Sequence, residues 1–98
     1  MGTKARITWN VRLTKSVERS IKTLPKDVRS NLVTLFRDIE FHGPVSGNCP
    51  NYSKLSETQH HCHIKKGKPT YVALWEVVNK QVKIIEVTYA GTHEKAPY

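Results

Sequence analysis

The sequence has few of the features that mark several large classes of protein. Its two cysteines, Cys49 and Cys62, are too few for a disulfide framework and predict free thiols. No apolar run approaches the length of a membrane span, and the N-terminus lacks the apolar stretch of a signal peptide. We therefore expect a cytoplasmic protein that has no membrane segment and is not a disulfide-stabilised scaffold.

Motifs for metal and phosphate binding are also missing. The sequence has no glycine-rich phosphate loop, no Walker motif and no GxSxG motif. A zinc site would have to draw on His60, His61, Cys62, His63 and Cys49. Neighbouring strand residues point to opposite faces, and the CxxC and HxxxH spacings of zinc sites are absent. We expect neither a metal nor another cofactor.

Acidic residues are scarce. Asp and Glu number 8 against 16 Lys and Arg, which gives a formal net charge of +8 and a pI near 9.7. Such a balance favours a polyanionic partner, although a solubilising surface or an acidic protein partner fits the same charge. A length of 98 residues predicts a single domain over residues 1–98.

The first half of the chain alternates and then turns helical. Residues 6–13 alternate between apolar and polar side chains, as in a half-buried strand. Thr14 is a candidate N-cap for a short amphipathic helix, and Pro25 suits the first position of a second helix. One apolar stripe runs along that second helix: Val28, Leu32, Leu35, Phe36 and Ile39. The breaker His42-Gly43-Pro44 ends it.

The second half reads as strands. Residues 43–53 predict an irregular loop, and strands are expected over residues 60–66, 70–78 and 82–90, followed by a tail over residues 91–98. The order β-α-α-β-β-β predicts an α+β fold. In it, a helical hairpin packs on one face of a small, mostly antiparallel sheet.

The strand over residues 60–66 is the most unusual segment. Alternation directs Cys62 and Ile64 to the core and leaves His61, His63 and Lys65 on the open face, while His60 is expected to be a structural histidine with a hydrogen-bond partner. Histidines can transfer protons near neutral pH, and a lysine can stabilise the charge of a phosphorane-like transition state. A polar edge strand facing water would show the same residues.

The polar tail is the second candidate. Gly91 would let the chain turn sharply out of the sheet, and the residues after it include His93, Lys95 and Tyr98. A frayed terminus is the alternative, and Tyr98 could equally be an apolar anchor.

A nucleic-acid surface is expected on the helices. Arg19, Lys22, Lys26 and Arg29 recur every three or four residues, which fits either phosphate contacts or an ordinary solvated face. The loop residue Tyr52 is the aromatic best placed to stack on an RNA base.

From Val11 to Tyr98 the chain resembles the RelE/ParE superfamily of bacterial type II toxins. The resemblance rests on the opening strand and helical hairpin with Leu24-Pro25 at its corner, residues 50–55 (PNYSKL), residues 61–67 (HCHIKKG) and the terminal GTHEKAPY. The Gly-Thr-His element is similar to that of the YafQ-type branch.

This resemblance implies a toxin neutralised by a cognate antitoxin. Its relatives are mostly ribosome-dependent mRNA endoribonucleases, in which a ribose 2′-hydroxyl attacks the adjacent phosphate. The catalytic histidines of YafQ-type relatives match His63 and His93, and a terminal aromatic matches Tyr98. Basic residues of the second strand match Lys65 and Lys66.

The chain departs from the family pattern at two arginines. Val72 follows Tyr71 where many RelE-type sequences have Arg, and Glu94-Lys95 follow His93 where RelE-type tails carry another Arg. Phosphate stabilisation would then rest on Lys65, Lys66 or Lys95. A ParE-like inhibitor of DNA gyrase and an attenuated, antitoxin-binding member are the alternative readings.

Overall fold

A computed structural model of the chain describes residues 9–46 and 49–98. The elements are β1 (Asn10–Leu13), α1 (Lys15–Ile21), α2 (Lys26–His42), β2 (Ser53–Lys54), β3 (Gln59–Lys65), β4 (Tyr71–Asn79), β5 (Ile84–Thr92) and the 3-10 turn η1 (His93–Lys95). The strands form one sheet in the order β1-β5-β4-β3-β2, with β1 parallel to β5 and the other pairs antiparallel. The predicted α+β fold and mostly antiparallel sheet are confirmed. The start of the first predicted strand, residues 6–8, lies outside the described residues.

The helices begin and end close to where the sequence predicts. The Thr14 hydroxyl accepts a hydrogen bond from the backbone N–H of Val17 (3.2 Å), so Thr14 caps α1 as expected. Pro25 precedes α2 as its N-cap residue instead of being its first residue. At the other end, Gly43 has a φ of 94° and its N–H donates to the carbonyl of Ile39, which ends α2.

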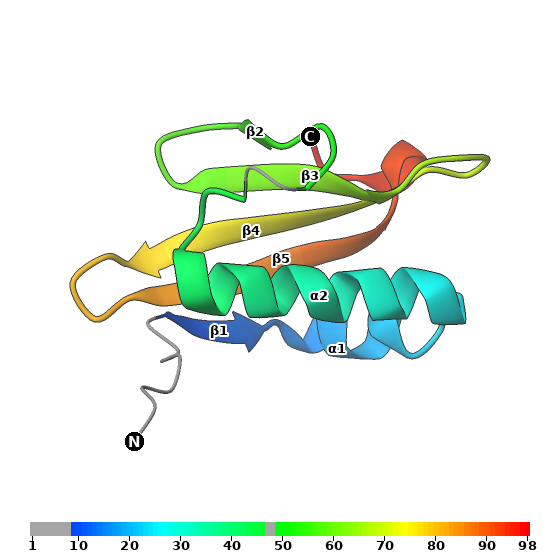
Figure 1. Cartoon of the computed structure of the whole chain (residues 1–98). Coiled ribbons are helices and arrows are strands. Elements are labelled where there is room, and N and C mark those ends of the chain that lie inside the picture. Colours follow the sequence, from blue (N-terminus) through cyan, green and yellow to red (C-terminus); the bar gives the residue numbers. More distant parts are fainter. Residues whose placement is uncertain (1–8, 47–48) are drawn as a thin grey trace, which may run out of the picture.

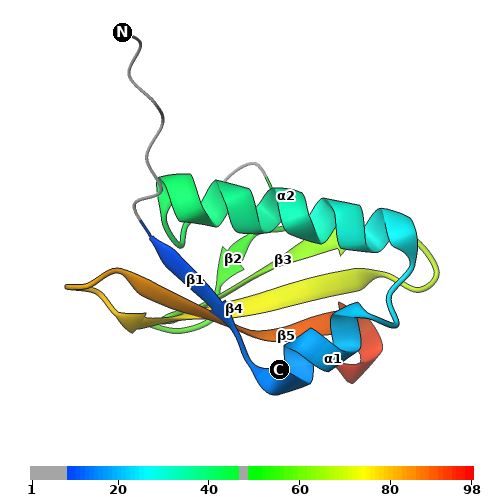
Figure 2. The ribbon, with the colours of Figure 1, turned by 90° about the horizontal axis from the view of Figure 1, so that it is seen from below.

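The core lies between the helices and the sheet. Four of the five residues in the apolar stripe of α2 are buried, and the fifth, Phe36, is partly buried. The strand β4 contributes Trp75, which is 1% exposed, to the centre of the core. Figure 2 shows α2 on one side of the sheet and the C-terminal end on the other. Beyond η1 the chain runs back toward β3 (Figure 1), on the face that α2 leaves open. Within the described residues, no helix is long and apolar enough to cross a bilayer.

The prediction of free thiols is wrong. Cys49 and Cys62 form a disulfide with a Cα–Cα distance of 5.9 Å. Cys62 is completely buried in β3, and the segment before β2 folds back on that strand, where the Pro50 carbonyl accepts a hydrogen bond from the backbone N–H of His63 (2.8 Å). The strand β2 follows this segment and pairs with β3; it begins at Ser53, the last residue of the region predicted to be an irregular loop.

Candidate functional site

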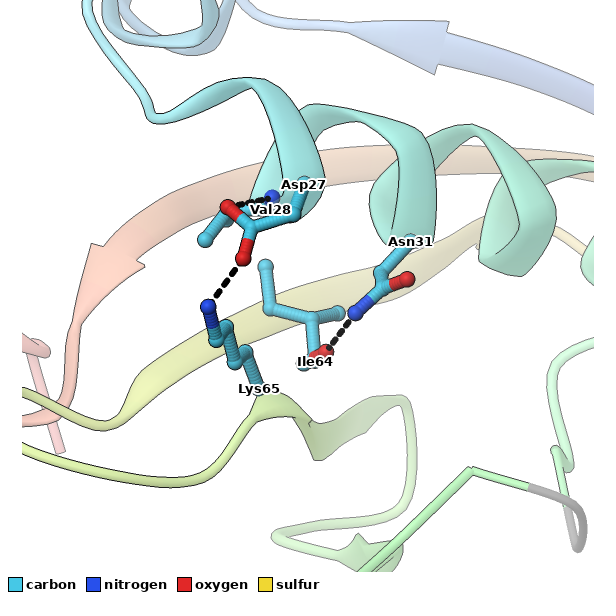
Figure 3. Close-up of polar contacts among 5 residues, drawn as sticks. All are labelled: Asp27, Val28, Asn31, Ile64 and Lys65. Atoms are coloured by element: carbon cyan, nitrogen blue, oxygen red, sulfur yellow. Dashed lines mark hydrogen bonds and ion pairs between the residues drawn. The ribbon is translucent and has the colours of Figure 1, made fainter.

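The strand β3 carries an irregularity that decides which side chains face the open side. His63 pairs with Val72 and Lys65 with Tyr71, so the register shifts and Ile64 has no partner in β4. In such a bulge, two successive side chains can turn to the same side. Ile64 is buried in the core, and Lys65 forms an ion pair with Asp27 at the start of α2 (Figure 3). The expectation that Lys65 shares the open face with the histidines is therefore wrong.

Polar contacts from α2 hold this bulge in place. The side-chain amide of Asn31 donates a hydrogen bond to the Ile64 carbonyl (2.8 Å), next to the ion pair of Lys65 with Asp27 (Figure 3). Asp27 also accepts a hydrogen bond from the backbone N–H of Val28 (2.9 Å), and the Lys65 ammonium lowers its pKa. These contacts from α2 stabilise the bulge directly after His63, where the alternation of side chains along β3 is interrupted.

Four rings from β3 and the C-terminal tail meet on the open face. We call His61, His63, His93 and Tyr98 the ring cluster. The centroid distances are 6.0 Å for His61–His63, 5.5 Å for His63–His93, 4.9 Å for His61–Tyr98 and 5.8 Å for His93–Tyr98. The structure therefore brings together the strand histidines and the tail residues that were predicted separately.

The tail is held by hydrogen bonds and does not leave the sheet at Gly91. The strand β5 continues to Thr92, and Gly91 pairs with Val72. A Cβ at Gly91 would lie 2.8 Å from the Tyr89 hydroxyl, which donates to the Thr92 carbonyl (2.6 Å). Glycine is needed for this close approach and not for the predicted turn. The turn is made by η1, anchored by the hydrogen bond from the N–H of His93 to the Thr70 carbonyl (2.8 Å).

His60 has the structural role that the sequence predicts. It is 3% exposed, its Nδ1 lies 2.7 Å from the Tyr52 hydroxyl, and its ring stacks on Trp75. Burial, followed by the charge of Lys54, lowers the pKa of His60. Tyr52 packs against His60 and Trp75 and is partly buried, and its predicted role of stacking on RNA stays a prediction.

The electrostatics of the cluster centre on His63. Burial lowers its pKa, and the neighbouring positive charges of His61, His93 and Lys66 lower it further. A lowered pKa keeps His63 neutral, and able to accept a proton, near neutral pH. The pKa of Tyr98 is raised, first by burial and then by the charge of Tyr89, so its phenol keeps its proton near neutral pH. Lys66 is one of the positive charges that act on His63, whereas the Lys65 ammonium is paired with Asp27.

A cleft of about 670 Å³ opens beside two members of the cluster. Its lining joins the β3–β4 turn to the tail: His63, Gly67, Lys68, Pro69, Thr70, His93 and Glu94. Lys68 was missed from the sequence, where it stands only as a turn residue. Lys68 lies in the turn that follows the strand with His61 and His63, and this closeness in sequence could have identified it as a candidate. Two histidines and an ammonium around one cleft suit proton transfer at a phosphodiester.

The other candidate residues lie elsewhere. Lys95 is exposed in η1, and the basic side chains of the helical hairpin are all exposed: Arg19, Lys22, Lys26 and Arg29. Arg19 and Lys22 line a shallow hollow of about 310 Å³ on α1. Their predicted contacts with RNA stay a prediction.

Of the zinc ligands considered above, Cys49 and Cys62 are joined in the disulfide. Within residues 9–46 and 49–98, no group of three or more His, Cys, Asp or Glu side chains could hold a metal ion.

Comparison with solved structures identifies the fold. An archaeal RelE–RelB complex from Pyrococcus horikoshii superposes with a TM-score of 0.62 at 20% identity, covering 91% of this chain and 99% of that one. The YoeB dimer from Staphylococcus aureus gives 0.68 at 15% identity, covering 88% and 98%. The isolated Escherichia coli RelE toxin gives 0.65 at 13% identity, covering 91% and 88%. The chain has the fold of RelE-type toxins. No protein-family model matches the sequence, and neither does any curated protein sequence.

Proposed function

We propose that this RelE-fold protein is the toxin of a type II toxin–antitoxin pair. Its activity is ribosome-dependent cleavage of mRNA, which inhibits translation. The observation that supports this most strongly is the ring cluster beside the cleft, because two histidines whose rings lie 5.5 Å apart both line a space of about 670 Å³. The RelE-type fold supports the same assignment.

In this reaction a ribose 2′-hydroxyl attacks the adjacent phosphorus, and the P–O5′ bond breaks. His63, kept neutral by its lowered pKa, accepts the 2′-hydroxyl proton. His93, which also lines the cleft, gives a proton to the departing 5′-oxygen. The products are a 2′,3′-cyclic phosphate and a 5′-hydroxyl, so one proton enters and one leaves the protein in each cleavage.

Lysines take the place of the arginines that RelE-type sequences carry. Lys66 is close enough to His63 to influence its pKa, and Lys68 lines the cleft, so both can stabilise negative charge on the phosphate. Tyr98 is half exposed beside His61 and His93, where its protonated ring can orient the scissile nucleotide. His61 contacts the substrate.

The partners follow from the same proposal. The substrate is mRNA on the ribosome, in the cytoplasm, and the basic side chains of the helical hairpin face ribosomal RNA. One solved structure of this fold is a RelE–RelB complex, which supports a cognate antitoxin protein for this chain as well. The excess of basic residues favours an antitoxin segment with acidic side chains over the site.

Inducible expression tests this function. We expect wild type to stop growth and to generate new mRNA 5′-hydroxyl ends in phase with codons. His63→Ala and His93→Ala should each reduce cleavage about 100-fold or more, because each removes a proton-transfer group. The matched control is His42→Ala, since the His42 side chain lies on α2 and is 71% exposed.

Growth arrest without new 5′-hydroxyl ends would contradict the nuclease assignment, as would normal cleavage by both site variants. DNA damage signalling without RNA cleavage would instead indicate a gyrase inhibitor of the ParE type.

A further inference from the structure

The two-residue strand β2 places Ser53 directly against His61. The two residues are register partners in the β2–β3 ladder. The Ser53 hydroxyl oxygen lies 3.0 Å from Nδ1 of His61, and the Ser53 carbonyl oxygen lies 3.3 Å from the same nitrogen. Both hydrogen bonds that the His61 side chain makes among the described residues therefore involve Nδ1.

These two contacts select one form of the ring. A carbonyl oxygen can only accept a hydrogen bond, so Nδ1 must carry a hydrogen for that contact to be favourable. The hydroxyl can accept from the same N–H or turn its own hydrogen elsewhere. A neutral imidazole has one N–H, so its lone pair must then be on Nε2.

The segment that carries Ser53 is held on both sides. Before it, the disulfide joins Cys49 to β3, and the Tyr52 hydroxyl bonds to Nδ1 of His60 (2.7 Å). After it, the N–H of Leu55 donates to the Gln59 carbonyl (2.7 Å). Successive hydroxyl residues thus contact Nδ1 of successive histidines, one on the core side of β3 and one on the open side. Such anchoring gives Ser53 the rigidity that orienting a ring requires.

We propose that Ser53 is a positioning residue that holds His61 with Nδ1 protonated and leaves Nε2 as a hydrogen-bond acceptor for RNA bound beside His63. This inference rests on the proposed nuclease function, and it gives His61 a defined part in substrate contact. His61 is 8% exposed and its ring centroid lies 4.9 Å from that of Tyr98, so the orientation of the ring is restricted.

Nitrogen NMR of the histidine rings tests the first half of the proposal without any need for activity. In protein labelled with ¹⁵N at histidine, we expect His61 to show a protonated Nδ1 and an unprotonated Nε2 at neutral to mildly alkaline pH. Ser53→Ala should increase the other tautomer, and Ser53→Thr, which keeps the hydroxyl, should restore the wild-type pattern. An unprotonated Nδ1 in the wild type would overturn the proposal.

Paired substitutions at His61 test the second half. In His61→Asn the side-chain amide can take the place of Nδ1 and keep a hydrogen bond to Ser53, but it offers nothing at the position of Nε2. His61→Gln reaches that position with an amide oxygen that can accept. We expect mRNA cleavage to fall at least 10-fold in the Asn variant and less in the Gln variant, with equal thermal stability.

Cleavage by the Asn variant at the wild-type rate, or no advantage of Gln over Asn, would overturn the role assigned to Nε2. If wild type itself cuts no RNA, the proposed function fails, while the NMR result still decides whether Ser53 sets the tautomer. The two failures can thus be told apart.

Discussion

The disulfide between Cys49 and Cys62 should make a large, measurable contribution to stability. The bond spans a sequence separation of 13 and attaches the segment before β2 to the buried strand β3. In the chain-entropy treatment, a cross-link closing about 13 residues stabilises a protein by about 3 kcal/mol, because it reduces the freedom of the unfolded chain. For a domain of this size, that corresponds to a fall in Tm of about 12 to 24 °C on reduction.

Thermal unfolding followed by circular dichroism measures this effect. The oxidised protein would be compared with the same protein in a phosphine reductant and with a Cys49→Ala/Cys62→Ala double variant. Thiol alkylation and mass spectrometry would establish how many cysteines are free in each sample. A change in Tm of less than 3 °C, with complete oxidation before and complete reduction after treatment, would refute the reasoning.

Three further predictions follow from the site and its surroundings. Lys66→Met should reduce mRNA cleavage at least 10-fold. Lys65→Met should leave cleavage near the wild-type rate, because the Lys65 ammonium pairs with Asp27 in an exposed ion pair and does not line the cleft; equal losses in the two variants would contradict the assignment. His60 has a lowered pKa in the folded protein, so below pH 6.5 its imidazole takes up a proton in the unfolded chain while it stays neutral in the native state. Its contribution to stability is therefore fully present above pH 6.5 and is lost as the pH falls through the folded-state pKa. The slope of Tm against pH below 6.5 should therefore be smaller in His60→Gln. Gly91→Ala should destabilise the fold by about 1 to 2 kcal/mol in denaturant titrations, because the new Cβ displaces the Tyr89 hydroxyl from its hydrogen bond; an unchanged midpoint would show that Tyr89 adjusts without loss.

The elements of the fold could be predicted because their signals are local. The Thr14 cap, the apolar stripe of α2 and the alternation of the strands each depend on spacings within a few residues. The two-residue strand β2 has no such pattern, because it is stabilised by its pairing with β3 and not by its own composition.

The site was predicted in part. The rings of His61, His63, His93 and Tyr98 do meet, because the tail after β5 runs back over the open face of β3. Lys65 was misplaced because period-two alternation holds only where the register is regular, and the shift after His63 reverses it.

Contacts between distant segments account for the remaining errors. Nothing in the local sequence shows that the segment containing Cys49 returns to β3, so neither the disulfide nor the packing of Tyr52 on His60 could be expected. Lys68 was missed for a similar reason, because the cleft exists only once the tail has been placed beside the β3–β4 turn.

The chemistry of the cut ends tests the central claim most directly. Purified protein would be added to translating ribosomes carrying a defined mRNA, and the ends of the fragments would be analysed. We predict a 2′,3′-cyclic phosphate on the upstream fragment and a 5′-hydroxyl on the downstream one, both lost in His63→Ala and retained in His42→Ala. Intact mRNA with wild-type protein, or cleavage that persists in His63→Ala, would contradict the account.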